Sequence, residues 1–177
     1  MLETSLRKKQ WSAEDYRKLP EGSLYQLING ELLMSAAPKK THQEILGDLF
    51  SEIHHFVKEA DTGTVYPAPF DVYFDERNVL QPDICFIASE NSKNFRDDGY
   101  FYGSPDLVIE ILSPSNAIED FTRKFRAYEK FGVKEYFIVD PESKDVIAYS
   151  LTNGKYQEVY RESGIIISGV LHHEFHF

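Results

Sequence analysis

The sequence contains a single cysteine, Cys85, among its 177 residues. A disulfide framework within the chain is therefore excluded, and this usage fits a reducing cytoplasmic location. The cysteine lies in the apolar segment Asp83-Ile-Cys-Phe-Ile87. A lone thiol in such a segment is predicted to be a small buried hydrophobic group.

Long hydrophobic runs are also missing. No segment approaches the ~18 consecutive apolar residues of a membrane span, so we expect no membrane association. Residues 1–10 contain no apolar stretch and do not predict a signal peptide. The chain has no internal repeat and no long Pro/Gly/Ser linker, and its length is enough to bury a sizeable core. We therefore expect one domain spanning residues 1–177.

Positive charge is scarce. The chain has 19 Lys and Arg against 29 Asp and Glu, a formal net charge of −10. Proteins held on nucleic acid mainly through phosphate contacts are usually basic, so any nucleic-acid surface here has to be local. The candidates are Arg7-Lys8-Lys9, Arg17-Lys18, Lys39-Lys40, and a group formed by Arg123, Arg126 and Lys130. The alternative is that these are solvated surface charges.

Hydrophobic spacing and turn signals indicate the elements of the fold. Ser12, followed three residues later by Asp15, predicts a capped helix start. Asn29-Gly30 predicts a tight hairpin turn that needs positive φ. The polar segment 90–103 is either a loop near a site or a surface connection. We expect helices at 11–19, 41–59 and 117–131, hairpins at 25–34 and 146–160, and strands at 64–66, 70–74, 83–87, 107–112 and 135–140. This order predicts an α/β (α+β) fold with a mixed central sheet flanked by helices and added β-hairpins.

One lysine does not fit the pattern of its helix. The apolar stripe of segment 117–131 is formed by Ala117, Phe121, Phe125 and Tyr128, and Lys124 falls on its margin. Glu119, Arg123, Arg126 and Lys130 are predicted to point the other way. A lysine angled toward a core is costly unless something there holds its charge.

Two acids at the ends of apolar strands could supply that charge. Asp83 begins one apolar strand, and Glu110 lies near the end of another. Oxygen ligands suit Mg²⁺, and a positive group can orient water and offset transition-state charge. Two acids and an inward lysine therefore suggest a divalent-metal site that handles phosphate.

Pro82-Asp83, then Glu110 on a following strand, then a lysine, resembles the PD-(D/E)xK nuclease superfamily. The usual lysine position, two residues after the second acid, is Leu112 here, and Lys124 matches the branches whose lysine lies in the next helix. More narrowly, six segments resemble a bacterial restriction-endonuclease family. They are Leu27-Ile-Asn-Gly-Glu-Leu32, Ser35-Ala-Ala-Pro38 with His42, Gln81-Pro-Asp-Ile84, Ser104-Pro-Asp-Leu-Val-Ile-Glu-Ile-Leu-Ser-Pro114, Asp120 with Lys124 and Tyr128, and Gly132-Val-Lys-Glu-Tyr-Phe-Ile-Val-Asp-Pro141.

The resemblance implies a restriction-endonuclease-like core that cleaves DNA, expected to be double-stranded, with Mg²⁺ or a substituting Mn²⁺ and no organic cofactor. It implies that Asp83, Glu110 and the backbone carbonyl of Ile111 hold the metal and that Lys124 is the catalytic lysine. Glu31 matches the family's upstream acid, which joins the metal site or binds a second ion. Cutting both strands would need two sites, so a homodimer is expected.

Three further residues are secondary candidates, each with a plainer interpretation. His42 opens a helix and either touches the site or caps the helix. Asp106 also follows a proline, and it either rivals Asp83 or caps a turn. Asp120 lies one helical turn before Lys124, where it either positions the lysine or forms an ordinary i,i+4 ion pair.

Two other functions remain open on the sequence alone. The acidic charge and Leu112 at the usual lysine position favour a non-catalytic nucleic-acid-binding or protein-interaction module on a nuclease-like fold. Hydrolysis of another phosphate ester is a third reading. The terminal His172, His173 and His176 lack the spaced partners of a structural zinc site.

Overall fold

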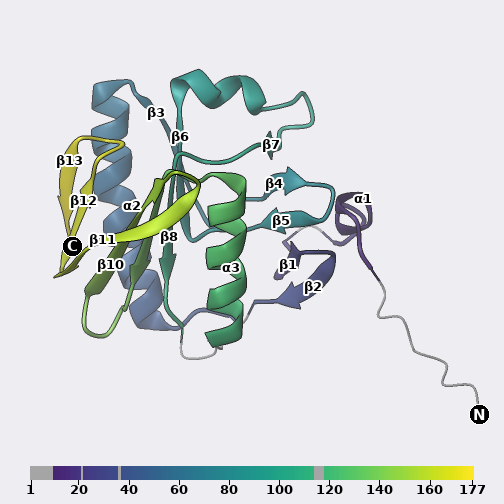
Figure 1. Ribbon diagram of the computed structural model, residues 1–177, viewed down its shortest axis with the longest axis horizontal. Helices are drawn as coiled ribbons and strands as arrows, with labels where there is room; N and C mark the ends of the chain where they lie inside the picture. Colours follow the sequence, from purple (N-terminus) through teal and green to yellow (C-terminus); the bar gives the residue numbers. More distant parts are fainter. Residues whose placement is uncertain (1–9, 21, 36, 114–117) are drawn as a thin grey trace, which may run out of the picture.

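The computed structural model describes residues 10–20, 22–35, 37–113 and 118–177, with only the backbone of 118–120. The helices are α1 (Ala13–Tyr16), α2 (Lys40–Ala60) and α3 (Ile118–Phe131), with the 3₁₀ helix η1 (Ser89–Asn94). The strands are β1 (Tyr25–Ile28), β2 (Glu31–Met34), β3 (Gly63–Pro67), β4 (Val72–Asp75), β5 (Asn78–Leu80), β6 (Ile84–Ala88), β7 (Phe101–Tyr102), β8 (Leu107–Ile111), β9 (Glu135–Val139), β10 (Asp145–Thr152), β11 (Lys155–Ser163), β12 (Ile165–Ser168) and β13 (His173–His176). Figure 1 shows their arrangement.

A six-stranded sheet forms the centre, in the order β11-β10-β9-β8-β6-β3. Strands β8 and β9 pair in parallel, and the other neighbours pair antiparallel. Helix α3 is the crossover between the two parallel strands. Strands β8 and β9 are buried at every position, as expected for central strands that are covered on both faces.

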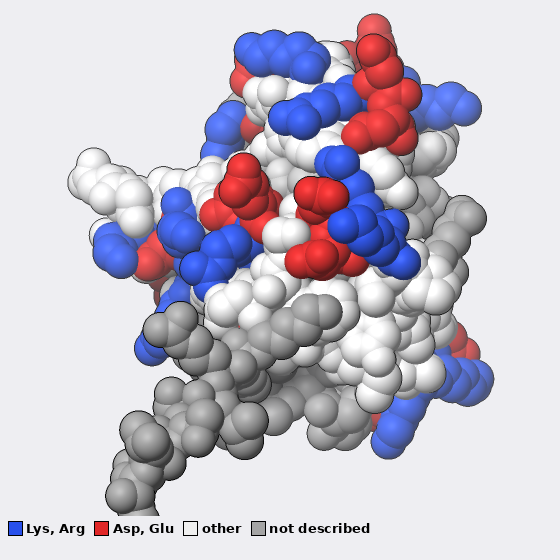
Figure 2. All heavy atoms as spheres, turned by 90° about the vertical axis from the view of Figure 1, so that its right-hand side faces the viewer, with Lys and Arg blue, Asp and Glu red and all other residues white. Residues whose placement is uncertain are grey.

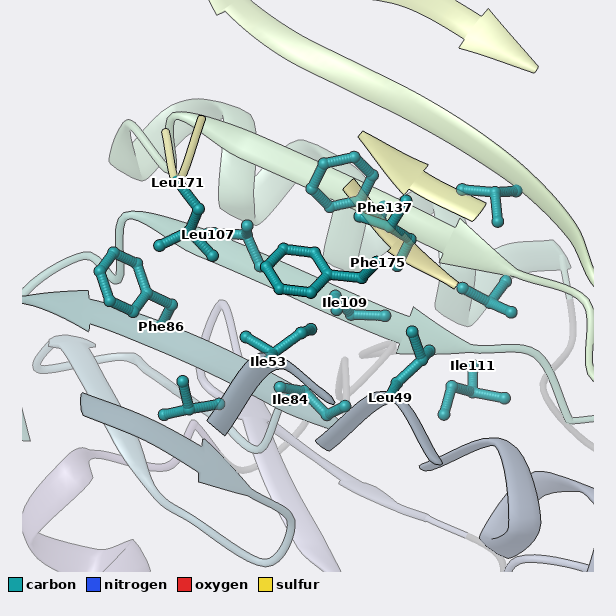
Figure 3. Packing of buried hydrophobic residues seen from close by; sticks show 14 of the residues in the cluster. Leu49, Ile53, Ile84, Phe86, Leu107, Ile109, Ile111, Phe137, Leu171 and Phe175 are labelled. Atoms are coloured by element: carbon teal, nitrogen blue, oxygen red, sulfur yellow. The ribbon is translucent and has the colours of Figure 1, made fainter. Parts of the chain in front are cut away.

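Helix α2 and the β12-β13 hairpin cover one face of this sheet (Figure 1). The helix presents Ile45, Leu49, Ile53 and Val57 at four-residue spacing, which places them on one side. These side chains pack with Ile109 and others from alternate positions of the sheet in one core cluster (Figure 3). Burial of this apolar area fixes α2 against the sheet.

Helix α3 packs on the opposite face in a second core cluster, which includes Val108, Ala127 and Tyr128. A second sheet, ordered β2-β1-β5-β4-β7, contributes Ile28 and Leu80 to the same cluster. The other side of this smaller sheet packs with α1 in a third cluster. The β1-β2 hairpin is therefore held close to α3.

The main predicted elements are confirmed. The side chain of Ser12 accepts a hydrogen bond from the backbone of Asp15, and the reciprocal bond completes the capping box. Asn29 and Gly30 have φ values of 51° and 80°, as the predicted hairpin turn requires. Cys85 is fully buried, and burial raises the pKa of its thiol.

Other elements were not predicted. Strands β5 and β7 have three and two residues, too few for a period-two pattern to show. The β12-β13 hairpin was also missed, and the polar segment 90–103 contains most of η1. No helix within the described part of the chain is long and apolar enough to cross a membrane.

Candidate metal-binding active site

Neighbouring antiparallel strands bring Asp83 and Glu110 to the same end of the central sheet. Ile84 of β6 pairs with Ile109 of β8, so Asp83, one residue before β6, lies opposite the end of β8. There Oδ2 of Asp83 accepts a 2.7 Å hydrogen bond from the backbone N–H of Ile111. The register of the sheet thus fixes the spacing of the two predicted acids.

Helix α3 supplies two partners to Glu110. Nζ of Lys124 lies 2.8 Å from Oε2 of Glu110, and the hydroxyl of Tyr128 donates a 2.6 Å hydrogen bond to Oε1. Lys124 and Tyr128 are four residues apart and so lie on one face of the helix. Glu110 and Lys124 are each only 6% exposed. The lysine predicted to turn inward does so, and a carboxylate holds its charge.

The ionised form of Glu110 is disfavoured by its surroundings. Burial, with a further contribution from the charge of Asp83, raises the pKa of Glu110 to about 7, although Lys124 and the hydroxyl of Tyr128 oppose the shift. Two carboxylates that repel each other in a poorly solvated place favour binding of a cation.

His42 lies against this pair and does not cap α2. Its Nε2 is 3.3 Å from Oδ2 of Asp83, and its side chain is nearly buried. Burial lowers the pKa of His42, but the hydrogen bond and charge of Asp83, the charge of Glu110 and the backbone of Ile111 raise it above its ordinary value. Of the two interpretations of His42, contact with the site is the one that its contacts support, and capping of the helix is not.

Glu31 contacts a residue that the sequence analysis had placed elsewhere. Oε2 of Glu31, at the start of β2, lies 2.8 Å from Nη1 of Arg123. The side chain of Arg123, predicted on the outward face of its helix, is 31% exposed and reaches sideways to the β1-β2 hairpin. A helical wheel gives an angle about one helix and cannot show that a hairpin lies beside it.

Two secondary candidates are not assigned to the site. Asp106 lies at the opposite end of β8 from Ile111, where it accepts hydrogen bonds from the backbone of Ala88 and from Asn91 and pairs with Lys134 at 2.7 Å. These contacts hold neighbouring segments of the chain together, so Asp106 has a structural role and does not rival Asp83. The side chain of Asp120 lies outside the described residues.

The donor set suits a hard divalent cation. Asp83, Glu110 and Lys124 line a cavity of about 270 Å³ together with His42 and Ser113. Within the described residues, no group of three or more His, Cys, Asp and Glu side chains is arranged to hold a metal. Mg²⁺ is usually bound by one or two carboxylates and keeps several waters or substrate oxygens, so two carboxylates beside the backbone of Ile111 fit it.

Tyr128 lies in the core, as predicted, but the bond of its hydroxyl to Glu110 was not predicted. The contact between Arg123 and Glu31 was not predicted either. The available signal for Tyr128 was its position one turn after Lys124, which places both side chains on the same face. For Arg123 no local signal exists, because its partner is 92 residues away.

The comparisons agree with this architecture. A family model described as "Uma2: Putative restriction endonuclease" matches residues 13–175. The crystal structure of a putative nuclease from Anabaena variabilis is similar to this chain, with a TM-score of 0.70 and 22% sequence identity over 83% of each chain, and this likeness shows a shared fold. No curated protein matched the chain. Because the family match spans nearly the whole sequence, the chain belongs to the Uma2 family of putative restriction endonucleases, with a restriction-endonuclease-like α+β fold.

Proposed function

We propose that this protein is a Mg²⁺-dependent DNA endonuclease whose site is formed by Asp83, Glu110 and Lys124. The observation that carries the proposal is the buried Lys124–Glu110 pair, 2.8 Å apart and beside Asp83 at the wall of a cavity. Burying an ion pair gains little stability, so the pair is better explained by a role in function. The family to which the chain belongs supports nuclease chemistry.

The residues have separate roles in this proposal. Asp83, Glu110 and the backbone carbonyl of Ile111 would hold the ion, and Tyr128 fixes the orientation of the Glu110 carboxylate. A bound divalent ion would polarise the scissile phosphate and lower the pKa of a coordinated water. Lys124 places a positive charge at the cavity wall, where it orients the attacking water or offsets charge that develops on the phosphate.

Glu31 is not among the described residues that line the cavity with Asp83 and Glu110. Arg123 holds its carboxylate, and the helix that carries Arg123 also carries Lys124. We propose that Glu31 positions the start of α3 through this ion pair and is not a ligand of the ion in the free protein. Because hydrolysis of both strands of a duplex would need two sites, we also propose that the active species is a homodimer.

A non-catalytic binding module is the second candidate. The net charge of −10 favours it over an enzyme that grips duplex DNA through many phosphates. The face in Figure 2 also shows basic and acidic side chains interspersed, without a continuous positive surface. Metal-dependent turnover separates the two candidates.

The test is a plasmid-nicking assay with Mg²⁺, Mn²⁺ or EDTA, on the full chain and on Glu110→Gln and Lys124→Met. Glu59→Gln and Lys58→Met are matched controls, because these residues lie exposed near the end of α2. We expect nicking with metal, none with EDTA, and at least a hundredfold loss in the two site variants only. Equal nicking by all five proteins would contradict the proposal. RNA and small phosphodiesters are tested in parallel. Their cleavage, without nicking of DNA, would identify another phosphate ester as the substrate.

A further inference from the structure

A second cavity lies beside the candidate active site. It has a volume of about 430 Å³ and shares His42 and Ser113 with the cavity that contains Asp83. It lies just past the carboxyl ends of the parallel strands β8 and β9 and includes Leu112 and Asp140. Ligands of open α/β sheets characteristically bind in the crevice outside the carboxyl ends of such strands.

The lining of this cavity suits a flat organic group. Leu112, Phe121, Ile138 and Ile147 give it a mainly apolar wall that includes one aromatic ring. Pockets for small organic ligands are mainly apolar, carry a few polar groups and have volumes of roughly 300–1,000 Å³. A nucleobase has two apolar faces and a polar edge, so it fits a wall of this kind.

His42 connects the two cavities. Its Nε2 faces Asp83 at 3.3 Å, whereas Nδ1, on the other side of the imidazole ring, is buried and has no hydrogen-bond partner in the described part of the chain. Buried polar atoms are nearly always satisfied, and an unpaired one calls for an explanation. Because His42 lines both cavities, a ligand that extends from one cavity into the other would pass next to this side chain.

The negative net charge of the protein indicates that contacts other than those to phosphate groups hold the substrate. The net charge is −10, and the face in Figure 2 shows basic and acidic side chains interspersed among uncharged ones. Phosphate contacts alone are therefore a weak source of affinity here. Stacking of one base on an aromatic side chain can strengthen binding by roughly ten- to hundredfold and does not depend on net charge.

We propose that this second cavity binds one unpaired nucleobase of the DNA substrate, next to the phosphodiester that is cleaved. The inference rests on the proposed nuclease function and names its substrate class: DNA with an unpaired or extrahelical nucleotide. The base packs on Phe121, its phosphate lies toward Asp83 and Glu110, and His42 lies between them.

The polar rim also predicts a base preference. Oε1 of Glu142 accepts a 2.9 Å hydrogen bond from the hydroxyl of Thr41, and an ionised carboxylate has room for further donors. Adenine and cytosine carry an exocyclic amino donor, and thymine does not. Guanine also carries an exocyclic amino group, whereas an unpaired thymine offers only its single imino N–H, so we expect thymine to be the least favoured base at the unpaired position.

The experiment measures binding of a duplex with one unpaired 2-aminopurine against the fully paired duplex, in Mg²⁺, with phosphorothioate linkages that slow cleavage. The expected result is about tenfold tighter binding of the unpaired duplex and a change in 2-aminopurine fluorescence. Ile147→Trp, which fills the cavity, should abolish both effects. Val159→Trp is the control, because Val159 is 57% exposed on β11 and does not line the cavity.

Two further variants keep the test decisive. If Ile147→Trp does not fold, Phe121→Ala removes the aromatic wall and should reduce the preference about tenfold. Glu142→Gln should weaken the preference for adenine over thymine, a readout that a merely structural role would not move. No preference for the unpaired duplex, or a preference that survives Ile147→Trp, would overturn the proposal.

The outcomes distinguish this inference from the proposed function. Metal-dependent nicking that needs Glu110, without any base effect, would remove the base pocket and keep the nuclease. A base effect that Ile147→Trp abolishes, without nicking of any substrate, would keep the base pocket and remove the nuclease.

Discussion

The hydroxyl of Tyr128 donates a 2.6 Å hydrogen bond to the same buried carboxylate that Lys124 binds at 2.8 Å. Beside it lies Tyr136, equally buried, whose hydroxyl has no hydrogen-bond partner among the described residues. The rings of the two tyrosines are 5.2 Å apart. One of these two buried hydroxyls is hydrogen-bonded and the other is not, so substitutions at the two tyrosines can be compared directly.

Tyr128→Phe and Tyr136→Phe should therefore have different effects on stability. Loss of the Tyr128 hydroxyl leaves a buried carboxylate oxygen unsatisfied, which should lower the free energy of unfolding by about 1–3 kcal/mol. Loss of the Tyr136 hydroxyl removes an unpaired polar group, so the change should be near zero or stabilising. Urea denaturation of both variants measures this difference, and equal losses would mean that the bond to Glu110 contributes nothing.

Removing one member of the Lys124–Glu110 pair should destabilise the protein more than removing both. Lys124→Met leaves a buried carboxylate without its cation and should cost about 3 kcal/mol or more. The double variant Glu110→Gln/Lys124→Met should unfold at a urea concentration closer to that of the wild type, because no unpaired buried charge remains. Additive losses in the double variant would show that the two side chains are not coupled.

Asp106 should contribute stability that depends on pH. Burial alone would raise the pKa of Asp106, but hydrogen bonds from Lys134, Ala88 and Asn91 and the charge of Lys134 lower it below its ordinary value. A carboxyl with a depressed pKa in the folded state stabilises the protein above its unfolded pKa, and this contribution is lost as the pH falls through the folded pKa.

Asp106→Asn should therefore lower the free energy of unfolding at pH 7, and the difference from the wild type should shrink below the ordinary carboxyl pKa of about 4. Denaturant unfolding at a series of pH values checks this. Metal affinity of the same variant near neutral pH should be unchanged, because Asp106 lies at the other end of β8 from Ile111. A difference that is independent of pH would contradict the assignment of Asp106 as a charged anchor.

Glu31→Gln tests whether Glu31 acts through Arg123 or is a ligand of the ion. The ion pair with Arg123 is partly exposed, so its loss should change stability by no more than about 1 kcal/mol. Affinity for Mn²⁺ in the absence of DNA should stay at the wild-type level, while Asp83→Asn should abolish it. A loss of metal affinity in Glu31→Gln as large as in Asp83→Asn would move Glu31 into the coordination shell.

The buried contact between Lys124 and Glu110 could be anticipated because each residue is unusual in its local sequence. Lys124 near an apolar stripe and Glu110 in an apolar strand are both costly without partners, and that cost is visible in the sequence. Tyr128 was assigned to the core because an aromatic residue on an apolar helix face looks the same whether or not its hydroxyl binds a carboxylate.

Features that depend on distant pairing could not be predicted. The Arg123–Glu31 contact joins residues 92 positions apart, across a hairpin whose place next to α3 follows from the whole fold. The order of the smaller sheet depends on β5, which has three residues and pairs with β1 at Leu27 and Val79. Such short strands form because tertiary packing covers them, and not because of a pattern of their own.

Calorimetric titration of Mn²⁺ into the wild type, Asp83→Asn and Glu110→Gln, with plasmid nicking measured on the same samples, tests the proposed roles of the two acids. We expect the wild type to bind the ion and nick DNA, and both variants to lose binding and nicking together. Unchanged Mn²⁺ binding and nicking in Asp83→Asn and Glu110→Gln would contradict this expectation, because the two acids would then serve the fold and not the chemistry.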